Sequence, residues 1–105
     1  MATVEMVRVY LTEHEGVLDA ILHCLHDQHP VRGVTVFRGI SGFGASGRMH
    51  EARWTDLSLD LPVVVEFFDD PGRSAEARTA LQQWVSAGHI VHWSAEVNEA
   101  TDEER

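Results

Sequence analysis

Residues 61–68 read LPVVVEFF, a run of β-branched and aromatic residues interrupted only by Pro62 and Glu66. Such residues favour strands, and a strand that is apolar on both faces is one that is buried on both faces. We therefore predict a strand over Leu61–Phe68 at the centre of a sheet. Its neighbours in that sheet must come from the segments that precede and follow it.

Three other segments have the composition and alternation of strands. They are Val4–Leu11, Val31–Ile40 and Ile90–Val97. Between the second of these and the central strand, Ser41–Leu59 shows no sustained period. We expect that segment to be a long loop.

Two helices are predicted between the strands. Thr12-Glu13-His14-Glu15 matches a capping box, and the helix that it begins must end at His29-Pro30. Asp70-Pro71 offers an N-cap and a first-turn proline for a second helix. The apolar stripe of that helix runs through Trp84 and Val85, and Gly88 is its expected stop.

The element order is therefore β-α-β-β-α-β, the arrangement called ferredoxin-like. This predicts an α+β domain over residues 1–97, with one antiparallel four-stranded sheet and both helices on one face. Residues 98–105 are predicted to be an acidic, flexible tail.

The other face of this sheet is expected to display Met6, Arg8, Tyr10 and Glu66. Large apolar groups beside charges on one face predict a surface that another subunit covers. Arg8 and Glu66 would lie on neighbouring central strands, where they either form an ion pair or remain two ordinary surface charges.

The charge balance excludes two classes of partner. The chain has 105 residues and a formal net charge of −9, and all eight of its basic residues are arginine. Without a basic face, binding to nucleic acid is not expected, and neither is attraction to a membrane surface. No apolar run is long enough for direct membrane insertion. The single cysteine, Cys24, fits a buried structural thiol and a cytoplasmic protein.

The predicted loop begins with four glycines in nine residues, from Gly39 to Gly47. Glycine adopts positive φ at little cost, so such a run can direct several N–H groups at an anion. Arg38 and Arg48 flank the run and could each hold a phosphate. The candidate ligand-binding residues are Arg38, Gly39, Gly42, Phe43, Gly44, Ser46, Gly47, Arg48, His50 and, from the turn before the last strand, His89.

The stretches FRGISGFGASGRMH (residues 37–50) and DLSLDLPVVVEFFD (residues 56–69) resemble the PII-like signalling proteins, in the branch named DUF190 or UPF0166. The resemblance implies a homotrimer with a T-loop over Ser41–Leu59. It also implies an adenine nucleotide, AMP, ADP, ATP or cyclic AMP, bound in clefts between subunits at the base of that loop. Such proteins are sensors rather than enzymes, and control a transporter, a channel or an enzyme partner.

The sequence departs from the PII pattern in two respects. The turn between the second helix and the last strand is expected to be too short to cradle phosphates, and the phosphate-binding lysines are absent. A weakly charged ligand such as AMP or a cyclic nucleotide is therefore expected in preference to Mg-ATP. No cofactor is required by this interpretation.

Three rival functions remain open. One is a trimeric interaction module that uses the loop without a nucleotide. A second is metal binding, because the chain has seven histidines, although none reaches a recognisable metal-ligand spacing and no metal residue is assigned. The third is catalysis by His50-Glu51 as an acid–base pair, for which a glycine-rich loop is a poor support. The sequence therefore predicts a sensor without catalytic residues.

Overall fold

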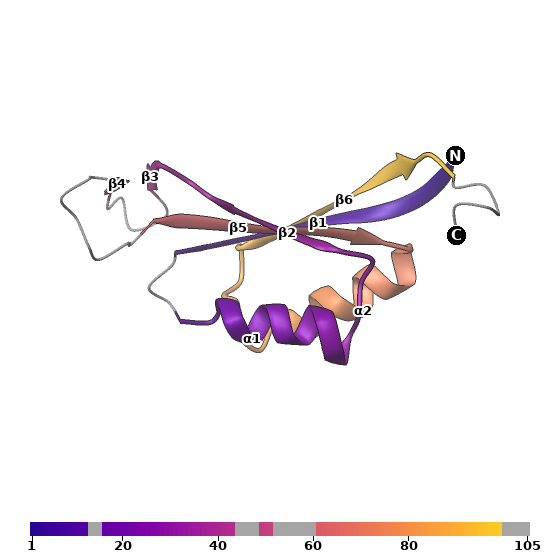
Figure 1. The fold of residues 1–105 in the computed structure, drawn as a ribbon, viewed down its shortest axis with the longest axis horizontal. Helices are drawn as coiled ribbons and strands as arrows, with labels where there is room; N and C mark the ends of the chain where they lie inside the picture. The colour runs from indigo at the N-terminus through magenta and orange to yellow at the C-terminus, as the bar shows by residue number, and fades with distance from the viewer. Residues whose placement is uncertain (13–15, 44–48, 52–60, 100–105) are drawn as a thin grey trace.

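The computed structural model describes residues 1–12, 16–43, 49–51 and 61–99, and for 49–51 only the backbone. The elements in chain order are β1 (Ala2–Thr12), α1 (Leu18–His23), η2 (Cys24–Gln28), β2 (Val34–Arg38), β3 (Ser41–Phe43), β4 (Met49–Glu51), β5 (Pro62–Asp69), α2 (Pro71–Leu81) and β6 (Ile90–Val97). Four of the strands form one sheet and both helices lie on one side of it (Figure 1). The α+β, ferredoxin-like fold is confirmed.

The sheet has the strand order β2-β5-β1-β6, and every neighbouring pair in it is antiparallel. β5 pairs with β1 on one side and with β2 on the other, so the strand predicted to be central is central. The strand predicted over Val31–Ile40 is shorter than expected, because only Val34–Arg38 pairs with β5. β2 and β6 are the two edge strands.

The core forms between the sheet and the helices by alternation along the two central strands. Val7, Val9 and Leu11 of β1 are buried on the helix side, as are Val63, Val65 and Phe67 of β5. The helices contribute Ile21, Cys24, Leu25, Ala77 and Leu81. Burial raises the pKa of the Cys24 thiol, which supports the structural role expected for it.

The predicted start of the first helix is wrong. Thr12 is the last residue of β1, where it pairs with Pro62, so it cannot cap a helix. The helix begins at Leu18 with Val17 in the N-cap position, and no side chain caps it. Its last turn widens into the π-helix η2, where the His29 amide donates to the Cys24 carbonyl at 2.8 Å. His29 ends the helix as Pro30 requires.

The second helix starts where the sequence predicts and stops earlier. Asp70 is the N-cap residue and Pro71 the first helical residue, but the Asp70 side chain makes no capping bond. Its carboxylate instead accepts a hydrogen bond from Arg32 at 2.9 Å. The α-helix ends at Leu81, seven residues before the predicted stop at Gly88.

No described element covers the sheet face opposite the helices (Figure 1). Arg8 Nε donates to a Glu66 carboxylate oxygen at 2.6 Å in the middle of this face, which confirms the predicted ion pair and raises the pKa of Arg8. The Arg8 guanidinium also lies over the Trp93 ring, 5.5 Å from its centre. Several large side chains on this face are exposed, including Phe37 at 49% and Tyr10 at 42%.

The segment Ser41–Leu59 contains regular structure that its sequence did not reveal. β3 and β4 pair as an antiparallel hairpin with the register Ser41↔Glu51, Gly42↔His50 and Phe43↔Met49. A three-residue strand is too short for alternation to be recognised in the sequence. The hairpin directly follows β2 and lies beyond the end of the main sheet (Figure 1).

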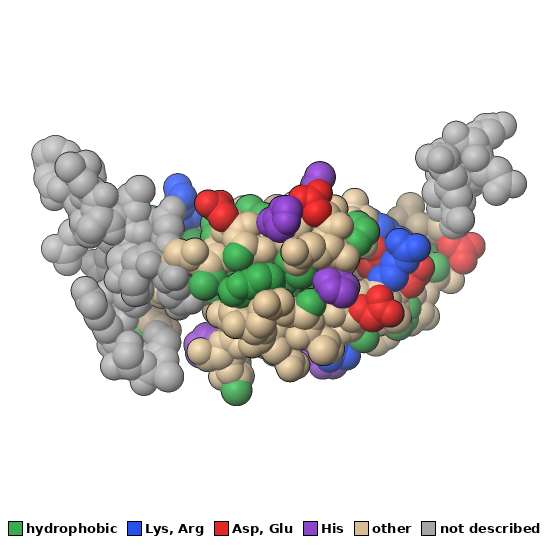
Figure 2. All heavy atoms as spheres, turned by 90° about the horizontal axis from the view of Figure 1, so that it is seen from below, with side chains coloured by type: hydrophobic (Ala, Val, Ile, Leu, Met, Phe, Trp, Pro, Cys, Tyr) green, Lys and Arg blue, Asp and Glu red, His purple; other side chains and the backbone are tan. Residues whose placement is uncertain are grey.

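The outer surface of the helix layer carries histidine and carboxylate side chains around a central group of hydrophobic ones (Figure 2). On that surface Asp27 contacts His26 at 2.6 Å and His23 at 2.8 Å, and the contact with His26 lowers the pKa of Asp27. No helix among the described residues is long and apolar enough to cross a membrane.

Candidate functional site

The predicted site residues at the base of the loop are spread over three elements. Arg38 ends β2 and pairs with the buried Val63, so its side chain projects from the helix side of the sheet. The Gly39 amide donates to the Pro62 carbonyl at 2.7 Å and is therefore not available to an anion. Phe43, in β3, is 71% exposed.

The other predicted ligand-binding residues of the loop are described only in part. Gly42 lies in β3 opposite His50, of which only the backbone is described. Gly44, Ser46, Gly47 and Arg48 lie outside the described residues. The assignment of these residues to a ligand stays a prediction.

The connection between α2 and β6 is longer than the sequence pattern predicts. Because α2 ends at Leu81 and β6 begins at Ile90, residues 82–89 form an eight-residue segment of turns. The expectation of a short turn at this point is therefore wrong. The apolar stripe predicted too long a helix, because Val85 is buried in the core although it lies outside α2.

This segment ends in a turn that leaves consecutive amides unbonded. The His89 amide donates to the Ser86 carbonyl at 3.2 Å, and Gly88 has a φ of +88°. A positive φ at the third residue of the turn identifies type II, which needs glycine there. The amides of Ser86, Ala87 and Gly88 have no acceptor among the described residues. Successive free N–H groups in such a turn form an anion-binding concavity.

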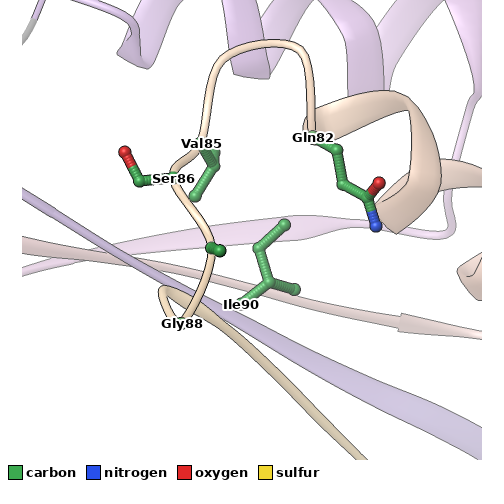
Figure 3. A pocket seen from close by; sticks show the side chains of 6 residues that line it. Gln82, Val85, Ser86, Gly88 and Ile90 are labelled. Atoms are coloured by element: carbon green, nitrogen blue, oxygen red, sulfur yellow. The ribbon is translucent and has the colours of Figure 1, made fainter.

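Beside this turn lies a hollow of about 420 Å³, within the size range of small-molecule sites. The side chains of Val85 and Ile90 face each other across it, while that of Ser86 points away (Figure 3). The hollow is therefore lined by two apolar side chains on one side and by residues of the turn on the other. Its lining residues are Gln82, Val85, Ser86, Ala87, Gly88 and Ile90.

None of the residues that line this hollow was predicted as a site residue. The predicted residue His89 follows Gly88 but is not part of the lining; its carbonyl accepts a hydrogen bond from the Tyr10 amide at 2.9 Å, so that this residue ties the turn to β1. Gln82 and Ser86 were missed. The available signal was the group Ser86-Ala87-Gly88, since serine and glycine close together mark turns.

The hollow and the loop base lie on the same side of the sheet but on its opposite edges. β5 and β1 separate β2 from β6. Three inter-strand spacings amount to about 14 Å. Arg38 and the turn Ser86–His89 therefore do not enclose one pocket within a single protomer. A ligand held at the turn needs a second wall from elsewhere.

The histidines do not form a metal centre in the part of the chain that the structure describes. No group of three His, Cys, Asp or Glu residues there could hold a metal ion. The contacts of Asp27 with His23 and His26 lie on an exposed helix surface.

The sheet order, the two helices on one face and the long β2–β5 connection define a ferredoxin-like fold of the kind found in PII-like proteins. More particularly, residues 4–97 match the family DUF190, described as "Uncharacterized ACR, COG1993", and the chain belongs to that family. It is also 34% identical over 65 residues to a UPF0166 protein of Aquifex aeolicus (strain VF5), a match covering 62% of this chain and 66% of that protein. The matched region is thus just under two thirds of that relative's length.

Solved structures of low sequence identity share the fold. CPII from Thiomonas intermedia K12, a nitrogen regulatory PII-like protein bound to ADP and bicarbonate, has a TM-score of 0.66 at 19% identity, over 93% of this chain and 91% of CPII. The divalent ion tolerance protein CutA1 from Ehrlichia chaffeensis has a TM-score of 0.60 at 10% identity, over 98% of this chain and 89% of that one. Identities this low support the architecture alone.

Proposed function

We propose that this protein is a cytoplasmic PII-like sensor that binds an adenine nucleotide in clefts between three identical subunits. The bound state would be passed through the loop Ser41–Leu59 to a transporter, a channel or an enzyme. The protein itself would carry out no catalysis. The observation that carries this proposal is the type II turn Ser86–His89 beside the 420 Å³ hollow, with three amides that find no acceptor in the part of the chain that the structure describes.

The hollow fits the two halves of a nucleotide. Backbone N–H groups in a turn bind phosphate oxygens without any lysine, which suits a chain whose basic residues are all arginine. The side chains of Val85 and Ile90 offer an apolar surface for a base or a ribose. CPII, which has the same fold, is bound to ADP and AMP.

The turn also changes which nucleotide is expected. A short turn and the absence of lysine both favoured a weakly charged ligand, and only the second reason remains. ADP therefore joins AMP and cyclic AMP as a candidate, and ATP stays the least favoured because its additional charge has no lysine partner.

A trimer would supply the missing wall of the site. The uncovered sheet face holds exposed Tyr10, Phe37, Val91 and Trp93 around the Arg8–Glu66 pair. An apolar face of this kind is buried by another subunit. A cyclic arrangement uses different patches on each subunit and closes on itself. A neighbour can thereby bring its loop base to the turn Ser86–His89.

The runner-up is an interaction module that uses the loop base without a nucleotide. The observation in its favour is the exposure of Ile40 at 80% and of Phe43 at 71%. Apolar side chains exposed to this extent beside a hairpin are suited to docking a protein partner.

Isothermal titration of the purified protein with AMP, ADP, ATP and cyclic AMP tests the proposal. We expect saturable binding of at least one of them, with GMP as the control for recognition of the base. Bicarbonate is titrated before and after the nucleotide, because CPII is bound to both. A protein that binds none of the four adenine nucleotides would contradict the proposal and favour the interaction module.

A further inference from the structure

The two described glycines of the loop base pack on one proline ring. A β-carbon added to Gly39 would stand 2.7 Å from Pro62 Cγ, and one added to Gly42 would stand 3.3 Å from the same atom. The first distance is shorter than carbon atoms tolerate, and the second is tight. The Gly39 backbone therefore approaches Pro62 more closely than a side chain would allow, whereas a side chain at Gly42 would need only a small shift of the Pro62 ring.

The same proline holds Gly39 by its backbone. The last residue pair between β2 and β5 is Arg38↔Val63, and the Gly39 amide donates to the Pro62 carbonyl at 2.7 Å immediately beyond it. Pro62 thus contacts the chain through its ring and through its carbonyl. Its fixed φ makes it a rigid support.

The hairpin begins directly after this contact. β3 starts at Ser41, and its partner β4 comes from the far side of the glycine run. β3 pairs with β4 and is not a strand of the main sheet, so the hydrogen bonds of this pair do not fix the position of the hairpin relative to that sheet. The packing of Gly39 and Gly42 against Pro62 connects the start of the hairpin sterically to β5.

We propose that Pro62, with Gly39 and Gly42 packed on it, is a hinge contact that sets the position of the β3–β4 hairpin relative to the sheet. Pro62 is a positioning residue in this account and need not touch a ligand. An effect of the hinge on ligand affinity rests on the proposed nucleotide function. The position of the hairpin relative to the sheet is independent of that function.

The test is a mutant cycle read by NMR and amide hydrogen exchange. In Gly39→Ala we expect the amide resonances of residues 41–43 to shift, and exchange of the residue-39 amide to accelerate about fivefold or more, since one hydrogen bond is weakened. Adding Pro62→Ala removes the ring atom that clashes and keeps the carbonyl. The double variant should therefore recover resonances and exchange close to those of Pro62→Ala alone.

Gly33→Ala is the matched control, because a β-carbon there meets nothing within 4 Å and its φ is not positive. It should leave residues 41–43 unchanged. Slow exchange of the Val65 and Phe67 amides verifies that the sheet of each variant is folded. Equal spectra for Gly39→Ala and Gly33→Ala would overturn the proposal. It would also be overturned if the spectrum of the double variant differed from that of Pro62→Ala as much as the spectrum of Gly39→Ala does.

Nucleotide affinity of the same variants is measured separately. If the cycle behaves as expected and no variant or parent binds a nucleotide, the hinge stands and the proposed function fails. If the parent binds a nucleotide and the mutant cycle shows no coupling between Gly39 and Pro62, the proposed function stands and the hinge fails.

Discussion

Replacing Ala87 with proline is expected to weaken nucleotide binding by about tenfold to a hundredfold while the protein stays folded. Ala87 is the second residue of the type II turn Ser86–His89, a position that favours proline. Proline removes one of the three free amides. A hydrogen bond to a charged group contributes about 1.5–3 kcal/mol, and each 1.4 kcal/mol corresponds to about tenfold in affinity.

Titration calorimetry measures the affinity and thermal unfolding measures the stability. The melting temperature should stay equal or rise slightly, because proline restricts the unfolded chain at a compatible position. Ala87→Ser is the control, since it keeps the amide on an exposed residue and should bind like the parent. Unchanged affinity in a folded Ala87→Pro protein would remove the turn from the site.

Replacing Val64 with glutamate is expected to dissociate the proposed trimer into folded monomers. Val64 lies on the uncovered sheet face, opposite Phe37 on β2 and Tyr10 on β1. An unpaired carboxylate buried in an interface there costs several kcal/mol. About 3 kcal/mol already raises a dissociation constant more than a hundredfold. In the monomer the same side chain can reach water, so the fold should survive.

Size-exclusion chromatography with light scattering measures the mass, and circular dichroism checks the fold. Thr79→Glu places the same charge on the exposed helix surface and should remain trimeric. A Val64→Glu protein with the mass of the parent trimer would show that the uncovered face is not the subunit interface.

The sheet could be predicted because its signals are local and repeated. The period of two places Val7 and Val9 of β1, and Val63 and Val65 of β5, on one buried face. The same alternation gives Arg8 and Glu66 a common face, and the structure joins them at 2.6 Å. Antiparallel strands with one buried face therefore specify their own register.

The helix ends could not be predicted in the same way. Periodicity records which residues are buried, and Val85 is buried at 8% exposure although its backbone has left the helix. Extending α2 to Gly88 followed from that burial. Gly88, the predicted stop of the helix, instead has a positive φ in the turn before β6. The hollow beside that turn was hidden as a consequence.

The role of the glycine run could be predicted only in part, because a local sequence pattern does not show contacts with residues distant in the chain. Gly39 and Gly42 were assigned to a ligand from their composition. In the structure both pack on Pro62, which lies twenty or more residues further along the chain. A close approach of this kind requires glycine as strictly as an anion site would. The ligand role of the run stays a prediction beside this structural one.

Native mass spectrometry of the protein with ADP tests the central claim most directly, because it reports assembly and ligand together. Three chains of 11.8 kDa give a trimer of about 35 kDa. The account predicts this trimer carrying up to three ADP molecules, with GDP at the same concentration leaving it unoccupied. A monomer, or a trimer that carries none of AMP, ADP, ATP and cyclic AMP when each is added well above its cellular concentration, would contradict it.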